Sequence, residues 1–369
     1  MTHLEHSVRK GLLISGYHSI SQASWSDFIV NQVADISWSI IALPPRYFSW
    51  RMRGNPLSIG QLAPKHLDQN YDVLLATSSI DLATVQSIYP ALRQTPSILY
   101  FHDNQFAYPA SNNPQSVVDW QITAIYSAIR ADKLVFNSQY NQDSFLSGVK
   151  KLLKKMPDLV PKQLAITLQQ KATVLAVPIQ KQTIGKKPTP EKNQKLRIVW
   201  NHRWEWDKSP ELLESIINKL QKHSENFELI ITGQQFRTVP VSFKRIQLQS
   251  KLISHCQFVE DKNQYQQMLT TCDVVLSTAI HEFQGIAVLE AVEAGCVPLL
   301  PNRLSYPEMF EANYLYLGEG SLEQQATSAV DTLINWLENG LPTIPDVNSF
   351  HESNLQPKYA ELITSLLFK

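Results

Sequence analysis

Two glutamates and two upstream cations have the residue types and the spacing to bind a charged sugar ligand. Glu282 and Glu290 lie eight positions apart in His-Glu-Phe-Gln-Gly-Ile-Ala-Val-Leu-Glu, and Arg203 and Lys208 lie in Asn-His-Arg-Trp-Glu-Trp-Asp-Lys. A loop carboxylate accepts hydrogen bonds from sugar hydroxyls, and a pair of cations neutralises a diphosphate. These residues therefore predict a sugar-nucleotide site in which both cations face an open cleft.

The elements around the acidic pair predict where the diphosphate would bind. An apolar strand at residues 274–277 leads into the loop, and Gly285 allows the backbone to approach a ligand closely. A helix is expected at residues 286–294, and its N-terminus offers unpaired N–H groups and the positive end of the helix dipole. Glu290 lies about one turn inside this helix, where a ribose diol is the expected partner.

The bare spacing of the two glutamates has a simpler interpretation. Such a pair also arises as a solvated loop acid followed by an acid on a helix surface. The preceding strand, the glycine and the cations that follow a second expected strand at residues 197–200 favour a functional site.

The length and the composition favour two domains without a strong overall charge. The chain has 369 residues, 43% of them hydrophobic, and 33 basic side chains balance 33 acidic ones. This length exceeds one ordinary core and fits two domains. The charge balance provides no overall field toward nucleic acid or membrane, so any contact with a polyanion must be local.

The cysteines and the apolar runs favour a cytoplasmic location. Cys256, Cys272 and Cys296 lack the paired spacing of metal or disulfide sites, so buried thiols in a reducing compartment are expected. No run approaches the roughly 18 apolar residues of a membrane span, and the first residues lack the layout of a signal peptide. We expect no stable membrane insertion, and the oligomeric state is left open.

Short apolar runs alternate with helix-like segments, which predicts two doubly wound, Rossmann-like α/β domains. Strands are expected at residues 12–15, 38–43, 73–77, 98–101, 133–137 and 173–177, then at 197–200, 228–232, 257–259, 274–277 and 297–300. Residues 179–195 carry five lysines and two prolines and predict an exposed linker. Ligands of such folds bind beyond the carboxyl ends of the strands, so we expect the two domains to face a central cleft.

The expected domain boundaries follow from these segments. The N-terminal, acceptor-side domain covers residues 1–180, the linker 181–195, the C-terminal nucleotide-sugar domain 196–345, and the C-terminal segment 346–369. The last segment is expected to form an amphipathic helix that needs a partner surface, for which the first domain is the candidate.

Five strings carry a resemblance to a known family. They are Phe101-His-Asp-Asn-Gln-Phe-Ala-Tyr-Pro109, Phe136-Asn-Ser-Gln-Tyr140, Trp200-Asn-His-Arg-Trp-Glu-Trp-Asp-Lys208, Ser277-Thr-Ala-Ile-His-Glu-Phe-Gln-Gly285 and Tyr306-Pro-Glu308. The chain resembles the tRNA-queuosine alpha-mannosyltransferases, a branch of the family 4 retaining glycosyltransferases with the GT-B fold. The likeness spans nearly the whole chain and weakens after about Gly320.

The resemblance implies a role for each residue that matches a family motif. The implied donor-binding residues are Arg203 and Lys208 for the diphosphate, Glu290 for the ribose, Glu282, Phe283, Gln284, Gly285 and Ile286 for the hexose, and Phe258 and Val259 for the nucleobase. Among these, Glu282 is also expected to serve the chemical step.

The resemblance implies that His102 is the catalytic residue of the first domain. Its position supports this independently, because it ends the expected strand at residues 98–101, at the edge where a cleft should lie. Gly16 and His18 are candidates for an N-terminal donor loop. That loop has a single glycine where relatives commonly have two, which puts its contact to the donor phosphates in doubt.

The resemblance also implies transfer with retention of configuration, through attack on the face that the diphosphate leaves. We expect no metal, because the chain contains no Asp-x-Asp pair, and no permanently bound cofactor. Positive charge from the cations and the helix start would then stabilise the leaving group.

The acceptor side is expected in segments that mix cations with aromatic rings. Residues 45–53 interleave three arginines with three aromatics, which suits phosphate contacts and base stacking, although rings that cap a core edge would give the same pattern. Lys150, Lys151, Lys154 and Lys155 form a basic helix face or simply a solvated one. The candidate acceptor-binding residues are Arg46, Trp50, Arg51, Arg53, Asp103 and Asn104.

Three functions remain open from the sequence. The first is transfer of a hexose, specifically mannose from GDP-mannose, to the queuosine of a tRNA anticodon. The second is a family 4 glycosyltransferase with a small-molecule, lipid or glycan acceptor. The third is a sugar-nucleotide-binding protein without turnover, against which the presence of Glu282, Arg203 and Lys208 argues.

Overall fold

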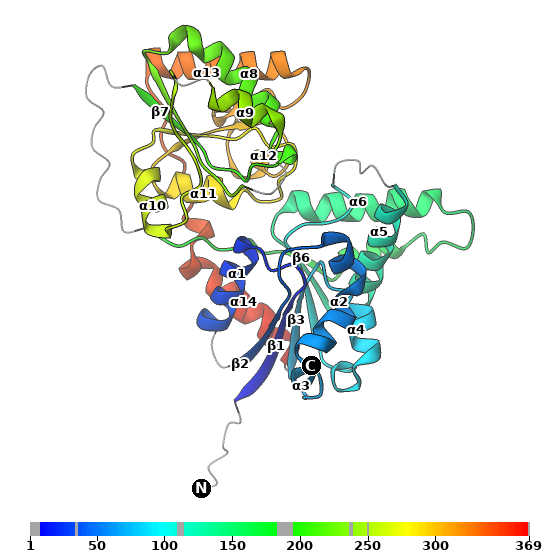
Figure 1. Cartoon of the computed structure of the whole chain (residues 1–369). Helices are drawn as coiled ribbons and strands as arrows, with labels where there is room; N and C mark the ends of the chain where they lie inside the picture. The colour runs from blue at the N-terminus through cyan, green and yellow to red at the C-terminus, as the bar shows by residue number, and fades with distance from the viewer. Residues whose placement is uncertain are drawn as a thin grey trace. The chain divides into compact units, whose positions relative to one another are not determined.

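The computed structural model describes residues 8–33, 36–108, 114–182, 195–235, 239–248 and 251–367 (Figure 1). The chain divides into two compact units. Unit 1 consists of Met1–Pro178 together with Glu352–Lys369, and unit 2 consists of Ile179–His351.

Unit 1 is built on a six-stranded parallel sheet with the strand order β2-β1-β3-β4-β5-β6. The central strands β3 and β4 are buried at every position, because helices cover both faces of the sheet. The strands are β1 (Arg9–Ser15), β2 (Ile36–Ala42), β3 (Val73–Thr77), β4 (Ser97–Phe101), β5 (Lys133–Phe136) and β6 (Ala172–Val174). The helices are α1 (Ile20–Gln32), α2 (Phe48–Leu62), α3 (Pro64–Leu67), α4 (Leu82–Ile88), α5 (Pro114–Arg130), α6 (Gln139–Lys155), α7 (Leu164–Gln169) and α14 (Glu352–Leu367).

Helix α14 is the last helix of the chain and packs in unit 1 beside α1 (Figure 1). Its buried residues are Leu355, Tyr359, Ile363 and Leu366, which lie on one face at helical spacing. The hydroxyl of Tyr359 accepts a hydrogen bond from the indole N–H of Trp25 (3.0 Å) and donates to the carbonyl oxygen of Ala176 (3.0 Å).

Unit 2 contains a second six-stranded parallel sheet, with the order β12-β11-β10-β7-β8-β9. In Figure 1, α8, α9 and α13 cover one face, and α10 and α11 lie on the other. The strands are β7 (Leu196–Trp200), β8 (Phe227–Ile231), β9 (Ile253–Cys256), β10 (Val274–Leu276), β11 (Val297–Pro301) and β12 (Leu315–Tyr316). The helices are α8 (Pro210–Leu220), α9 (Val241–Gln247), α10 (Lys262–Thr270), α11 (Ile286–Glu293), α12 (Tyr306–Met309) and α13 (Leu322–Asn339).

Each sheet has a switch point next to its first strand, where the order of strand addition reverses. This point lies between β1 and β3 in unit 1 and between β7 and β10 in unit 2. Connections leave the two strands of a switch point toward opposite faces, which opens a crevice at their carboxyl ends. In unit 2, the loops that begin there carry the two motifs with Arg203–Lys208 and Glu282.

The expected doubly wound parallel sheets are confirmed, but the structure differs from the expectations at three places. The strand expected at residues 257–259 is a loop, and the strand is β9, which ends at Cys256. The two-residue strand β12 was not expected at all. Ile179 is buried and its N–H donates to the carbonyl oxygen of Phe350 (2.9 Å), so an exposed linker does not begin there. Most of the expected linker, residues 183–194, lies outside the described residues.

Two further expectations concern the thiols and the apolar runs. Cys272 and Cys296 are buried and form no disulfide, as expected, whereas Cys256 is only partly buried. Among the described residues, no helix combines the length and the apolar character needed to cross a membrane.

We expect Tyr359→Phe to destabilise unit 1 by about 1–3 kcal/mol, because Trp25 and Ala176 would each lose a buried hydrogen-bond partner. Urea unfolding followed by tryptophan fluorescence measures this change. Tyr126→Phe is the matched control, since the Tyr126 ring is exposed and the variant should change stability by less than about 0.5 kcal/mol. An unfolding midpoint of Tyr359→Phe equal to that of the wild type would contradict this prediction.

Candidate functional site

The candidate site of unit 2 is formed by the loops that follow β7 and β10. Hydrogen bonds join the two loops. Thr278 Oγ1 donates to the carbonyl oxygen of Lys208 (2.6 Å), and the N–H of Ile280 donates to the carbonyl oxygen of Asp207 (2.9 Å). Ser209 has a φ of 47°, so the backbone turns through the left-handed region directly after Lys208. The two motifs therefore form one structural element.

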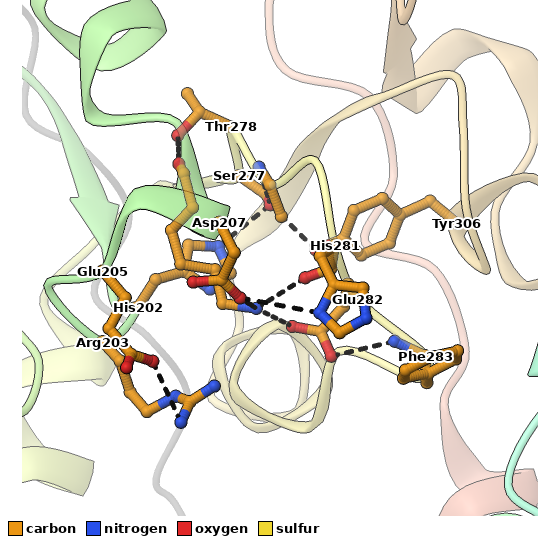
Figure 2. Close-up of polar contacts among 12 residues, drawn as sticks. His202, Arg203, Glu205, Asp207, Ser277, Thr278, His281, Glu282, Phe283 and Tyr306 are labelled. Carbon is orange, nitrogen blue, oxygen red and sulfur yellow. Dashed lines mark hydrogen bonds and ion pairs between the residues drawn. The ribbon is translucent and has the colours of Figure 1, made fainter. Parts of the chain in front are cut away.

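Lys208 lies at the centre of a buried charge cluster. Its ammonium group donates to the carbonyl oxygen of His281 (2.7 Å) and to Glu282 Oε2 (3.2 Å), and it lies 3.3 Å from Asp207 Oδ2. Figure 2 shows Asp207, His281 and Glu282 converging from the two loops. Lys208 is only 5% exposed, so the expectation of an open cation is wrong for this residue. Three acceptors use the three N–H groups of the ammonium.

The cluster controls the ionisation of its own acids. Burial would raise the pKa of Glu282, but the charge and hydrogen bond of Lys208 are the main causes that lower it to about 2. Burial also opposes ionisation of Asp207, yet Lys208 and a hydrogen bond from His281 hold its pKa well below its ordinary value. Both acids are therefore carboxylates at neutral pH and stay fixed beside the lysine.

A buried hydrogen-bond chain supports the Glu282 loop from the core side. His202 Nε2 lies 2.9 Å from Ser277 Oγ, which lies 2.8 Å from the hydroxyl of Tyr306 (Figure 2). Burial, and then the charge of Lys208, lower the pKa of His202 to about 4. Burial raises the pKa of Tyr306 well above its ordinary value. The chain is therefore neutral and can pack beside the charge cluster without adding charge to it.

Gly285 is required where α11 begins. Its φ is 79°, a conformation that favours glycine, and a Cβ at this position would lie 2.9 Å from Cε1 of Tyr306. The tyrosine ring thus leaves little room for a side chain at the position where α11 begins.

Arg303 fixes the same loop from the opposite side. Its guanidinium donates to the carbonyl oxygens of Thr278 (3.2 Å), Ala279 (2.8 Å) and Gly318 (2.6 Å), and to Gln325 Oε1 (3.0 Å). Only arginine has a planar fork that reaches so many acceptors at once. Arg303 therefore positions the backbone that leads from β10 to Glu282.

Arg203 and Glu290 are the more open charged residues of this site. The side chain of Arg203 is 46% exposed, and its Nη1 lies 3.0 Å from Glu205 Oε2. Glu290 is partly buried in α11, and burial raises its pKa to about 7, opposed by the charge of Lys262. Of the two expected diphosphate cations, only Arg203 is thus open to a ligand.

The remaining expected donor-binding residues divide between the start of α11 and the end of β9. Phe283 and Gln284 are buried, and the N–H of Phe283 donates to Glu282 Oε1 (3.1 Å), so the turn before Gly285 and Ile286 is rigid. Phe258 and Val259 lie in the loop after β9, where Phe258 is exposed.

In unit 1, His102 and His18 lie at the carboxyl edge of the sheet. His102 follows β4 and packs against the rings of Trp25 (4.8 Å) and Tyr100 (4.7 Å). Burial, and then the nearby His18, lower the pKa of His102 to about 3, and burial also lowers that of His18. Among the described residues, His102 Nε2 and His18 Nδ1 have no hydrogen-bond partner. Both rings are neutral near physiological pH.

Two expected ligand residues of unit 1 make contacts within the protein instead. Gly16 donates its N–H to Thr77 Oγ1 (3.1 Å), and a Cβ at Gly16 would lie 2.7 Å from Ser79 Oγ. Asn104 is buried, and its amide donates to Asn141 Oδ1 (2.8 Å) while its oxygen accepts from two N–H groups of its own loop. Both residues shape loops rather than present a free group to a ligand.

Asp103 is less buried than Asn104, but it also contacts a neighbouring residue of unit 1. It is partly buried, and the hydroxyl of Ser78 donates to its carbonyl oxygen (3.0 Å) and to its Oδ1 (3.2 Å).

The expected acceptor arginines differ in exposure. Arg51 is 8% exposed, and its guanidinium donates to the carbonyl oxygen of Pro44 (3.4 Å) and to Ser58 Oγ (3.2 Å), so it is engaged within unit 1. Arg53 is exposed but pairs with Asp81 (3.0 Å). Arg46 is exposed and forms no ion pair among the described residues.

Sequence reasoning missed four residues that build the site: Asp207, Ser277, Arg303 and Tyr306. Ser277 directly follows an apolar strand and Asp207 precedes the motif lysine, so both positions carried a usable signal. Tyr306 lies in one of the strings that carry the family resemblance, but the sequence assigned no role to it or to Arg303, because their partners lie 15 to 29 positions away.

Within the described residues, no three or more His, Cys, Asp or Glu side chains gather as they would around a metal ion.

Comparison with known proteins matches both halves of the chain. Residues 10–179 match the model of the tRNA-queuosine alpha-mannosyltransferase N-terminal family, and residues 181–351 match that of the glycosyl transferases group 1. A tRNA-queuosine alpha-mannosyltransferase of Drosophila melanogaster is 34% identical over 296 residues, which cover 78% of each chain.

Solved structures share the fold at low sequence identity. The Anabaena protein HepE in complex with UDP has a TM-score of 0.67 at 14% identity and covers 96% of this chain and 100% of its own. An alpha,alpha-trehalose-phosphate synthase of Burkholderia xenovorans has a TM-score of 0.68 at 11% identity and covers 98% of this chain and 100% of its own.

Two doubly wound parallel sheets, with a charged loop at the switch point of the second, define a GT-B glycosyltransferase. The chain belongs to the tRNA-queuosine alpha-mannosyltransferase family.

We expect Lys208→Met to destabilise the protein by about 3–5 kcal/mol, because it leaves buried carboxylates without their cation. Lys208→Met combined with Glu282→Gln should be less destabilised than the sum of the single variants, by about 0.5–3 kcal/mol. Urea unfolding at neutral pH measures the free energy of unfolding of the wild type, the two single variants and the double variant. Additive effects would contradict the proposed coupling.

The same pair should give a pH signature. Since Lys208 lowers the pKa of Glu282 to about 2, its stabilisation is present above the ordinary carboxyl pKa and is lost as the pH falls toward 2. The Lys208→Met variant should lose less stability over this acid range than the wild type.

We expect Arg303→Lys to slow transfer at saturating substrate while affinity for the nucleotide changes little. Lysine keeps the charge but cannot bridge the carbonyl oxygens of Thr278, Ala279 and Gly318, so the loop with Glu282 becomes less well positioned. Steady-state kinetics and calorimetric binding of GDP separate the two effects. Arg245→Lys on α9 is the control, because Arg245 is half-exposed and pairs with Glu214 of α8 rather than with the loop that carries Glu282. Transfer by Arg303→Lys at the wild-type rate would refute this role.

Proposed function

We propose that this protein transfers mannose from GDP-mannose to the queuosine of a tRNA anticodon, with retention of the anomeric configuration. The family and its Drosophila relative, which is named a tRNA-queuosine alpha-mannosyltransferase, support this acceptor and this sugar. The observation that carries the proposal is the Lys208–Glu282 pair (3.2 Å) at the switch point of unit 2, directly before the N-terminus of α11.

In this proposal, the N-terminal N–H groups of α11 and the open guanidinium of Arg203 bind the diphosphate. The charge of Lys208 adds to this field, although its N–H groups hold the loop. Glu282 accepts hydrogen bonds from hexose hydroxyls with the backbone from Phe283 to Ile286, and Glu290 accepts them from the ribose. Phe258 and Val259 flank the nucleobase.

The chemical step forms one bond and breaks one. An acceptor hydroxyl oxygen attacks the anomeric carbon on the face that the diphosphate leaves, the bond between this carbon and the phosphate oxygen breaks, and the departing phosphate takes up the hydroxyl proton. Negative charge accumulates on the leaving diphosphate, so Arg203 and the helix N–H groups stabilise the transition state more than the bound donor. We propose that these groups make a metal ion unnecessary, which chelation by EDTA would test.

We assign the unit 1 contribution to His102. Its neutral ring follows β4 at the edge where ligands of doubly wound domains bind, and its Nε2 has no partner among the described residues. A neutral imidazole can donate to or accept from a sugar hydroxyl, so His102→Ala should slow transfer and leave GDP affinity unchanged.

Incubation with GDP-mannose and queuosine-containing tRNA tests the function. Nucleoside digestion and mass spectrometry should show queuosine that carries one added hexose. The same tRNA without queuosine is the control and should remain unmodified. The proposal fails if queuosine stays unmodified with every sugar nucleotide that binds, or if a small glycan or a lipid is glycosylated instead.

The affinity for GDP should increase as the pH rises through about 7, because burial raises the pKa of Glu290 to that value and only the carboxylate accepts from both ribose hydroxyls. Below this pH the neutral acid dominates and one acceptor site is lost. Glu290→Gln should bind GDP more weakly at high pH and lose this dependence, as measured by calorimetry over a pH series. Glu338→Gln, at an exposed position of α13, is the control. An unchanged pH profile in Glu290→Gln would contradict the ribose assignment.

A further inference from the structure

Six aromatic residues follow or adjoin the carboxyl ends of strands in the unit 1 sheet. They come from the loops after β1, β2 and β4 and from α2 and α5, and we call them the aromatic edge: Tyr17, Tyr47, Phe48, Trp50, Tyr108 and Trp120. His102 follows β4 at the same edge. Because ligands of doubly wound domains bind at this edge, aromatic rings there are placed to contact a ligand.

Phe48 is the packing centre of the aromatic edge. Its ring centroid lies 5.6 Å from that of Tyr17, 5.5 Å from that of Trp120 and 6.2 Å from that of Tyr108. The first two pairs are edge-to-face, an arrangement that aromatic rings favour. Phe48 therefore caps the local core, as the simpler interpretation of this segment requires.

Tyr47 does not fit that simpler interpretation. It is 70% exposed, and its backbone adopts a left-handed conformation with φ 56° and ψ 52°. A non-glycine residue is strained in this region, and such strain persists where the surrounding structure imposes it, often at functional sites. The strain holds a large apolar ring toward solvent, which no folding requirement explains.

A cation accompanies the exposed ring. The guanidinium carbon of Arg46 lies 5.6 Å from the ring centroid of Tyr47, within cation–π range. Because Arg46 forms no ion pair among the described residues, its charge remains available to a phosphate.

Trp50 provides a second fixed ring. It is 51% exposed, its indole N–H donates to Ser58 Oγ (3.1 Å), and its ring covers Gly54 so closely that a Cβ there would lie 2.5 Å from it. The ring is thus locked in place although half of it faces solvent. A pre-positioned ring loses little entropy when a ligand stacks on it.

From this arrangement we infer that Tyr47, with Arg46 and Trp50, is a stacking site for an unstacked nucleobase of the acceptor RNA. Exposed aromatic faces beside a guanidinium match the chemistry of a single-stranded loop, in which bases stack on rings and phosphates pair with arginine. The inference rests on the proposed function and extends it to the acceptor. It excludes Arg51, whose guanidinium is engaged inside unit 1.

Binding of a fluorescent anticodon stem-loop RNA to the full-length protein tests the site. By fluorescence anisotropy, Tyr47→Ala should weaken binding about tenfold, since stacking on one ring contributes about 1–3 kcal/mol per base. Tyr47→Phe should bind like the wild type. Tyr126→Ala, at another exposed tyrosine of unit 1, is the matched control and should change nothing.

Tyr47→Gly separates stacking from folding. Glycine relieves the left-handed strain, so this variant should have a melting temperature at or above that of the wild type while it binds the RNA as weakly as Tyr47→Ala. Arg46→Gln should reduce the dependence of binding on salt by about one phosphate contact.

A blunt RNA duplex identifies what the ring recognises, since it offers no free base. The duplex should bind Tyr47→Ala and the wild type equally well. The stacking site would be overturned if Tyr47→Ala lost affinity equally for the stem-loop and the duplex. It would also be overturned if Tyr47→Ala bound the stem-loop with wild-type affinity.

Mannosyl transfer separates the two proposals. If the wild type mannosylates queuosine and Tyr47→Ala has wild-type RNA affinity, the stacking site fails and the proposed function stands. If the wild type neither binds the stem-loop nor modifies queuosine, both fail.

Discussion

The buried ammonium of Lys208 is the constraint on which the candidate site depends. A cation that is almost fully removed from water is stable only when every N–H group has an acceptor and opposite charge lies close by. Asp207, the carbonyl oxygen of His281 and Glu282 meet this requirement, with distances from 2.7 to 3.3 Å. These acceptors come from the loops after β7 and β10, so the same interaction that satisfies the lysine also joins the two sides of the switch point.

The neutral groups around this cluster keep its geometry fixed. The hydrogen-bond chain of His202, Ser277 and Tyr306 supports the loop that carries Glu282. The guanidinium of Arg303 satisfies carbonyl oxygens of the same loop. A glycosyltransferase needs such rigidity, because charge develops on the leaving diphosphate and the protein stabilises it best with dipoles that need not reorganise. In the proposed function, Arg203 and Glu290, which are more open, bind the donor without disturbing the loop.

Both sheets could be predicted from the sequence because their central strands are continuous apolar runs, such as β3, β4 and β11, each buried at every position. The sequence predicts the edge strand at residues 257–259 instead of at β9, because β9 is only partly buried and has no continuous apolar run. The sequence also indicated the residue types of the donor motifs. It did not indicate the burial of Lys208, since two of its three partners, His281 and Glu282, lie more than 70 positions away. Spacing could not separate exposed Tyr47 from internal Arg51 either, because the helix that begins at Phe48 sends neighbouring side chains in different directions.

The most direct test of the central claim is the single-turnover rate of sugar transfer by Asp207→Asn. Asp207 contacts Lys208 and His281 and has no assigned contact with the donor, so it acts only through the cluster. If the cluster positions Glu282, the rate should fall by about ten- to a hundredfold, while affinity for GDP stays at the wild-type value. A wild-type rate in a folded Asp207→Asn protein would contradict the account.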